Sequence, residues 1–145
     1  MVSTVAQLNH VGITVTDLDA SLAFYRDLVG FELGLRTRAG GEWFDTLTRN
    51  EGADIEIVML RLADFTLQLV QYHASGGVTL PLAHHKVGSP HLCIEVDDVD
   101  VRHERIVASG LYEPTPIVEV LDTGIRSFYV HDPDGVPVEL LQGWS

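Results

Sequence analysis

Residues 10–20 read HVGITVTDLDA and residues 91–101 read HLCIEVDDVDV, so the chain carries two copies of one short pattern. Aligned without gaps, the copies agree at five of eleven positions, whereas unrelated segments of average composition would agree at about one. The identical pairs are His10/His91, Ile13/Ile94, Val15/Val96, Asp17/Asp98 and Asp19/Asp100. Such self-similarity indicates a duplicated structural unit.

Each copy predicts a strand followed by a helix. LNHVGITV alternates apolar residues with small or polar ones, which is typical of a half-buried strand. Asp17 or Asp19 can then cap the N-terminus of a helix, which we expect to end at Gly30. The second copy has the same order and ends at Gly110. A strand–helix unit is therefore expected at the start of each half.

Further strands are expected after each helix, and they complete a βαβββ unit. The expected strands are about 31–37, 42–48, 55–61 and 65–72 in the first half, and about 116–120, 127–131 and 136–142 in the second. The sequence DPDG at 132–135 is a strong turn signal between the last two strands. We expect one α+β domain over 1–145, built of tandem βαβββ modules in a curved mixed sheet or half-barrel with two outer helices. Module 1 spans about 6–73, the linker about 74–88 and module 2 about 89–145.

Composition narrows the function classes. The chain has 145 residues, with 9 Lys and Arg against 21 Asp and Glu, for a net charge of −12. So acidic a surface repels nucleic acid and anionic membranes. The single cysteine, Cys93, excludes a disulfide framework within the chain. We see neither a signal peptide nor an apolar run long enough to span a membrane, so a cytoplasmic protein is expected.

The ends of the two halves match as well, and they bring polar residues to equivalent strands. LQLVQ at 67–71 corresponds to VELLQ at 138–142, so each half has a His on its first strand and an amide or acid on its last. Side chains alternate along a strand, so the four residues point away from the aliphatic face of their strands. These candidate metal ligands are His10, Gln68, His91 and Glu139.

Two imidazoles, an amide oxygen and a carboxylate suit a divalent ion such as Co, Ni, Mn, Zn or Fe. With one negative charge among the ligands, the ion stays a good Lewis acid for substrate oxygens, and it can stabilise an enolate. A lone histidine on a strand is more often a structural residue. The duplication of all four positions favours the metal site.

The chain resembles the vicinal oxygen chelate superfamily, also called the glyoxalase/bleomycin-resistance/dioxygenase superfamily. The resemblance rests on LNHVGITVTDLDASLAFYRDLVGFEL at 8–33, HLCIEVDDVD at 91–100 and FYVHDPDGVPVELLQ at 128–142, and it covers nearly the whole chain. It implies paired βαβββ modules around a metal-containing cleft. Members of the superfamily are usually dimers, so a homodimer that acts on a small molecule is expected.

Within the superfamily, the order His, Gln, His, Glu is most similar to methylmalonyl-CoA epimerase, which implies a metal-dependent isomerase or epimerase acting through an enolate. The resemblance also implies a catalytic glutamate at Glu56, with Glu139 as a second proton-transfer group. Partial burial would raise the pKa of Glu56 towards neutrality, as a proton shuttle requires. The alternative is that Glu56 is an ordinary solvent-facing strand residue.

Three other functions stay open on the sequence. A glyoxalase I-like lyase usually has a carboxylate where Gln68 stands. An Fe(II) extradiol-type dioxygenase would use His10, His91 and Glu139 alone. A drug-sequestering resistance protein would bind its ligand without catalysis, and such members commonly lack the metal ligands. His84, His85 and Cys93 lie in or near the linker and the second strand–helix unit, and their roles are open.

Overall fold

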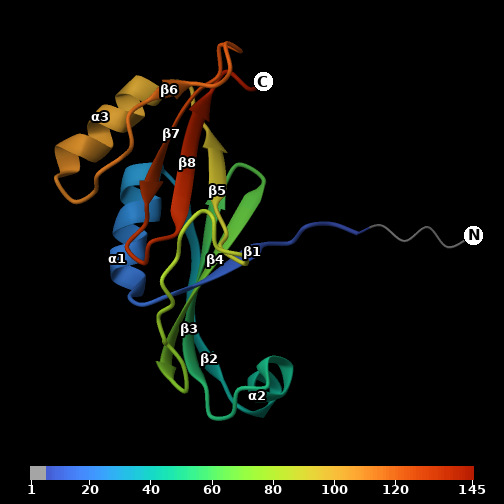
Figure 1. Cartoon of the computed structure of the whole chain (residues 1–145). Coiled ribbons are helices and arrows are strands. Elements are labelled where there is room, and N and C mark those ends of the chain that lie inside the picture. Colours follow the sequence, from blue (N-terminus) through green and yellow to red (C-terminus); the bar gives the residue numbers. More distant parts are fainter. Residues whose placement is uncertain (1–5) are drawn as a thin grey trace, which may run out of the picture. The chain divides into compact units, whose positions relative to one another are not determined.

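The computed structural model describes residues 6–145, and it contains two compact units, one ending at Val78 and the other spanning Thr79–Ser145. We call them module 1 and module 2. Each contains one four-stranded mixed sheet, in the order β1-β4-β3-β2 in module 1 and β5-β8-β7-β6 in module 2 (Figure 1). The first strand of each module pairs in parallel with the last, and the other pairs are antiparallel. The predicted duplication is therefore a duplication of topology.

Module 1 begins with a strand and a two-part helix and continues with three long strands. Its elements are β1 (Val11–Val15), α1 (Leu18–Leu22), the π-helical segment η1 (Ala23–Val29), β2 (Glu32–Gly40), α2 (Glu42–Thr48), β3 (Asp54–Leu62) and β4 (Phe65–Ala74). Module 2 repeats this order with a single central helix. Its elements are β5 (Leu92–Glu95), α3 (Val99–Ser109), β6 (Val118–Glu119), β7 (Arg126–His131) and β8 (Pro137–Gln142).

The central helices begin and end where the sequence predicts. The carboxylate of Asp17 accepts the backbone N–H groups of Asp19 and Ala20, and Asp98 accepts that of Val101. The C-caps Gly30 and Gly110 adopt positive φ angles of 107° and 67°, which suit glycine.

A second capping device is duplicated between the modules. The side-chain oxygen of Gln71 on β4 accepts the N–H of Leu18 at 2.9 Å, and that of Gln142 on β8 accepts the N–H of Val99 at 3.1 Å. Each glutamine thus satisfies one of the N–H groups that a helix start leaves without a partner. The last strand of each module is tied to its helix in this way.

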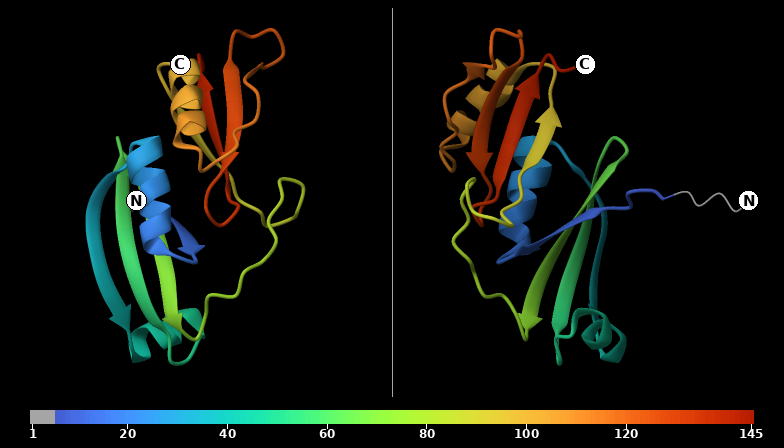
Figure 2. Two further views of the ribbon diagram at one scale, coloured as in Figure 1. Left: turned by 90° about the vertical axis from the view of Figure 1, so that its left-hand side faces the viewer. Right: turned by 45° about the vertical axis from the view of Figure 1, so that its right-hand side comes forward.

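One face of each sheet packs under its helix and forms the core (Figure 2). In module 1 this face carries Val58, Leu60, Leu67 and Leu69, all completely buried. In module 2 it carries Phe128, Val138 and Leu140, which are also buried. The opposite face of each sheet carries polar side chains beside apolar ones, Gln68 beside Met59 in module 1 and Glu139 with Leu141 in module 2.

The strand predicted at 42–48 is wrong, because those residues form helix α2 between β2 and β3 (Figure 1). Its aromatic pair, Trp43 and Phe44, favours strands by propensity. The carboxylate of Asp45 instead accepts the N–H groups of Gly52 and Ala53, which fixes the chain after the helix. Within the described residues there are thus three helices, counting α1 and η1 as one, where two were predicted. The π-helical form of η1 and the two-residue length of β6 were not predicted either.

The DPDG turn is confirmed and has a clear physical basis. The side chain of Asp132, which is almost completely buried, accepts the N–H groups of Asp134 and Val136 at 2.9 and 2.8 Å. Gly135 has a φ of 87° and donates its N–H to the carbonyl of Asp132. This turn sets the register of β7 against β8.

Candidate metal centre

Gln68 lies on the face of the first sheet away from the helix, as predicted. It pairs with Gly12 in the parallel β1–β4 ladder and with Met59 on β3. A Cβ atom at Gly12 would lie 3.3 Å from Oε1 of Gln68, so the missing side chain leaves room for the amide. The half-buried amide has no hydrogen-bond partner among residues 6–145. Within the described residues its oxygen is therefore available as a neutral ligand atom.

His10 lies just before β1, two residues from Gly12, and so falls on the Gln68 side by strand alternation. Its Nδ1 lies 2.6 Å from Oδ1 of Asn9. An amide oxygen can only accept, so Nδ1 is the donor in this contact and Nε2 is the nitrogen left to bind a cation. Metal-binding histidines commonly have such a partner on the second nitrogen. Module 1 thus has one imidazole and one amide on the same side of its sheet.

Glu139 is held on the corresponding face of the second sheet by two hydroxyl groups. Ser127 donates to its Oε1 at 2.7 Å, and Tyr129 donates to its Oε2 at 2.9 Å. Tyr129 is its direct neighbour in the β7–β8 ladder. A carboxylate has about four lone-pair sites, and Ser127, Tyr129 and the thiol of Cys93 use at most three of them, so the group can still bind a cation.

Tyr129 also contacts two histidines of module 2. The ring centroids of His91 and His84 lie 5.9 and 4.7 Å from that of Tyr129, and His84 lies 5.8 Å from His131. His91 and Glu139 therefore contact the same tyrosine, one through its ring and the other through its hydroxyl. Burial and the bond to Glu139 raise the pKa of Tyr129 to about 12, so it stays a hydrogen-bond donor.

Cys93 occupies the place in module 2 that Gly12 has in module 1. It pairs with Glu139 in the β5–β8 ladder, as Gly12 pairs with Gln68. Loss of hydration and the nearby Glu139 carboxylate raise the pKa of its thiol to about 12. The raised pKa makes the thiol a weak candidate for a nucleophile at neutral pH.

The four predicted ligands thus fall into two pairs, one per module, each on the face opposite its helix. Neither module gathers three or more His, Cys, Asp and Glu side chains at metal-binding spacing in the part of the chain that the structure describes. The imidazole and oxygen ligands nevertheless fit a divalent cation by type. His10, Gln68 and Glu139 in particular have free lone pairs in a defined environment.

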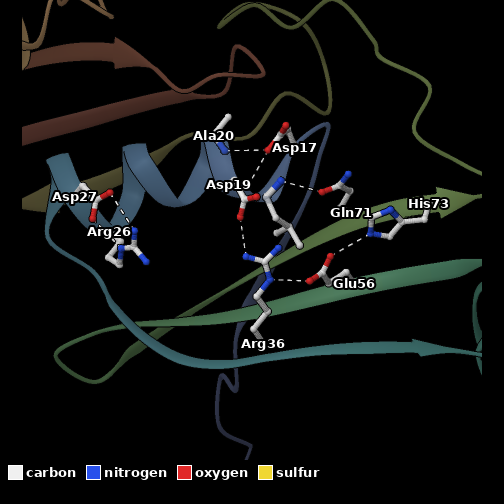
Figure 3. A network of polar contacts seen from close by, with 10 residues as sticks. Asp17, Asp19, Ala20, Arg26, Asp27, Arg36, Glu56, Gln71 and His73 are labelled. Atoms are coloured by element: carbon white, nitrogen blue, oxygen red, sulfur yellow. Dashed lines mark hydrogen bonds and ion pairs between the residues drawn. The ribbon is translucent and has the colours of Figure 1, made fainter.

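Glu56, the predicted catalytic base, lies elsewhere. It pairs with Gln71 and therefore shares the helix face of the sheet, whereas Gln68 and Met59 share the opposite face. Its carboxylate accepts from Nε of Arg36 at 2.6 Å and contacts Nε2 of His73 at 3.1 Å, and Arg36 also donates to Asp19 (Figure 3). These contacts join α1, β2, β3 and β4 at one end of the helix.

The expected rise in the pKa of Glu56 is wrong. The hydrogen bond from Arg36 is the largest effect and lowers the pKa of Glu56. Burial raises the pKa by less, and the contact with His73 lowers it again. In module 2 the equivalent ladder position, opposite Gln142, is Arg126, which forms a two-pronged ion pair with Asp100. In module 1, Arg36 joins Glu56 to Asp19 at the start of the helix. In module 2, Arg126 binds Asp100, which matches Asp19 in the repeat. Each ion pair therefore anchors the start of a helix to its sheet.

A shallow depression of about 610 Å³ lies on module 1 near the predicted ligands. It is lined by Asn9, Glu32, Leu33, Gly34, Leu35, Met59, Arg61 and Thr66. Arg36 and Arg38 are bound to carboxylates, but Arg61 has no carboxylate partner among the described residues. Arg61 therefore borders the face that carries Gln68, with Glu32 as its cross-strand neighbour but without an ion pair within residues 6–145.

Comparison with known proteins gives a consistent picture. The sequence model of the Glyoxalase/Bleomycin resistance protein/Dioxygenase superfamily matches residues 7–140. Over 142 residues the chain is 33% identical to 2-epi-5-epi-valiolone epimerase of Actinomyces sp., spanning 92% of this chain and 78% of that protein. It is also 31% identical to biphenyl-2,3-diol 1,2-dioxygenase of Metapseudomonas furukawaii, over 95% of this chain and 40% of that protein.

A solved structure of a glyoxalase family protein from Bacillus cereus has the same fold. It superposes with a TM-score of 0.86 at 20% identity, over 97% of this chain and 95% of the other. At that identity the likeness is one of fold. Among the described residues, no helix is long and apolar enough to cross a membrane.

Proposed function

Because the chain belongs to the glyoxalase/bleomycin resistance protein/dioxygenase superfamily, we propose that it is a divalent-metal-dependent isomerase or epimerase of a small carbonyl or acyl substrate. The proposed ligands are His10, Gln68, His91 and Glu139. Each module supplies one histidine and one oxygen ligand, and we propose that a homodimer is the working unit. The observation that carries the proposal is the matched placement of Gln68 opposite Gly12 and of Glu139 opposite Cys93.

The bound cation would act as a Lewis acid that polarises two substrate oxygens and lowers the pKa of the adjacent C–H group. The protein supplies position and proton transfer. Asn9 orients His10, while Ser127 and Tyr129 orient Glu139. Such partners of metal ligands fix ring and carboxylate geometry. We assign the transfer of the proton at the substrate carbon to Glu139.

The role predicted for Glu56 stays a prediction, and the geometry of module 1 gives it no support. Its carboxylate is ion-paired with Arg36 on the helix face of β3. A general base needs to reach the proton that it removes. We therefore expect Glu56→Gln to keep catalysis and Glu139→Gln to abolish it.

The experiment combines metal content with proton exchange. Purified protein is stripped with chelator, reloaded with Mn²⁺ or Co²⁺ and assayed in D₂O with 2-hydroxycyclohexanone as a small hydroxyketone probe. We expect one metal ion per four-ligand site and loss of the proton next to the carbonyl by NMR. Metal-free wild-type protein that rejects both ions would overturn the metal site, and metal-loaded protein without exchange on an extended hydroxyketone panel would overturn the isomerase assignment.

The similarity to a biphenyl-2,3-diol dioxygenase supports one further candidate. His10, His91 and Glu139 would then hold Fe²⁺ as a two-histidine, one-carboxylate site, which suits non-haem oxygenases. Oxygen uptake on a catechol panel with Fe²⁺ but not Mn²⁺ or Co²⁺ would favour this reaction. A sequestering protein would instead bind its ligand equally well with and without chelator.

A further inference from the structure

A small depression lies beside Glu139 on the face of module 2 opposite α3. It has a volume of about 360 Å³ and is lined by Cys93, Glu95, Glu139, Leu141 and Trp144. The first four come from β5 and β8, and they share a face because Cys93 pairs with Glu139 and Glu95 with Leu141. The fifth, Trp144, comes from the segment after β8.

Glu95 fixes that segment in place. Its Oε1 accepts the backbone N–H groups of Trp144 and Ser145 at 3.1 and 2.8 Å, and the hydroxyl of Ser145 at 2.8 Å. Gly143 turns the chain towards Glu95 with a φ of 91°, a conformation that favours glycine. Three donors on one carboxylate oxygen define the position of a segment that belongs to no helix or strand.

The indole of Trp144 is held at the depression but is not covered by the protein. The residue is 74% exposed, although tryptophan gains more than other side chains from burial. Leu141, in contrast, is 9% exposed and gives the depression an apolar surface. An exposed aromatic ring beside an apolar surface and a polar group is the usual composition of a small-molecule site.

We propose that this depression binds a ring or another flat apolar part of the substrate, which packs against the indole of Trp144. The substrate class is then a cyclic or aryl compound whose paired oxygens reach the cation at Glu139, and this assignment rests on the proposed function. Trp144 is then a residue that determines specificity, and Glu95 is a positioning residue that acts through it.

Two hydroxamates test the proposal, since both chelate metal ions through two oxygens and only one carries a ring. Binding of benzohydroxamate and acetohydroxamate to Co²⁺-loaded protein is measured by calorimetry. We expect Trp144→Ala to weaken benzohydroxamate about tenfold and to leave acetohydroxamate unchanged, because only the ring contact is lost. Trp144→Phe should restore most of the affinity. Equal losses for both hydroxamates, or no loss for either, would overturn the proposal.

The role of Glu95 is tested in the same assay. Glu95→Gln weakens the hold on the segment, so we expect a selective loss for benzohydroxamate that is smaller than that of Trp144→Ala. The matched control is Glu119→Gln, a carboxylate of the same module outside the depression. A selective loss in the control and none in Glu95→Gln would contradict the positioning role.

Fluorescence separates this proposal from the metal site. The chain has two tryptophans, so a Trp43→Phe background leaves Trp144 as the only indole. We expect benzohydroxamate to quench its emission saturably, at a concentration that Glu95→Gln raises. If the protein holds no metal, the proposed function fails, and the ring site is tested with phenol in place of the hydroxamates. Saturable quenching of Trp144 by phenol then supports the ring site. Absence of quenching overturns the ring site.

Discussion

Glu139 and Tyr129 lie directly opposite each other in the β7–β8 ladder, and the tyrosine hydroxyl donates to the carboxylate at 2.9 Å. If Glu139 binds a cation, this bond orients a metal ligand. Tyr129→Phe should then lower the affinity for Mn²⁺ or Co²⁺ by about 10–100-fold, as for other such partners, with little change in melting temperature. Metal titration by calorimetry measures the change. Tyr72→Phe, a tyrosine of module 1, is the control, and unchanged affinity in Tyr129→Phe would contradict the orienting role.

Gly12 provides the corresponding test in module 1. An added Cβ would lie 3.3 Å from Oε1 of Gln68, closer than most such contacts, so Gly12→Ala should displace the amide. We expect metal affinity to fall several-fold while the far-UV spectrum stays unchanged. Thr14→Ala, on the same face of β1, should leave the affinity as it is. Equal affinities in the two variants would argue against Gln68 as a ligand.

Loss of one of the two capping glutamines should lower the stability of the fold without changing metal affinity. In Gln142→Ala the N–H of Val99 loses its acceptor, which should lower the free energy of unfolding by about 1–2 kcal/mol. Gln142→Glu keeps the oxygen and adds a charge that suits a helix N-terminus, so it should retain stability. Urea unfolding measures both, and metal affinity should not differ between them. A stability equal to wild type in Gln142→Ala would refute the capping role.

The ion pair of Glu56 should make the free energy of unfolding depend on pH. Its pKa in the folded protein is lowered from the usual 4.5, chiefly by Arg36, so the ion pair stabilises the fold above that value. The contribution is lost as the pH falls through the lowered pKa. Glu56→Gln should therefore be less stable than wild type at pH 7, by on the order of 1 kcal/mol or less. In urea titrations the difference should vanish in acid, and a difference that grows in acid would refute the account.

Much of the fold follows from the repeated pattern, because a duplicated sequence with matching caps can form the same unit twice. Asp17, Asp98, Gly30 and Gly110 have the predicted roles. Residues 42–48 were mispredicted because aromatic residues favour strands by propensity, and tertiary contacts override that preference here. The contact of Asp45 with residues 52 and 53 decides between them, and it depends on tertiary structure.

The faces of Gln68 and Glu139 were predictable from strand alternation, whereas the surroundings of Glu56 were not. Alternation places Glu56 opposite its neighbours Ile55 and Ile57, but it does not tell which face meets the helix. The roles of Ser127 and Tyr129 were missed, because counting outward from the DPDG turn pairs Tyr129 with Val138. In the observed register His131 pairs with Pro137, which places Tyr129 opposite Glu139. The ion pair with Arg36 joins strands twenty residues apart, and no local pattern indicates it.

The most direct measurement is the anomalous diffraction of crystals grown with Co²⁺. The account predicts one strong peak per site, within about 2.0–2.2 Å of ligand atoms from His10, Gln68, His91 and Glu139, whether these come from one chain or from two. Cobalt bound only by other residues, or no peak at these side chains at saturating Co²⁺, would contradict the central claim.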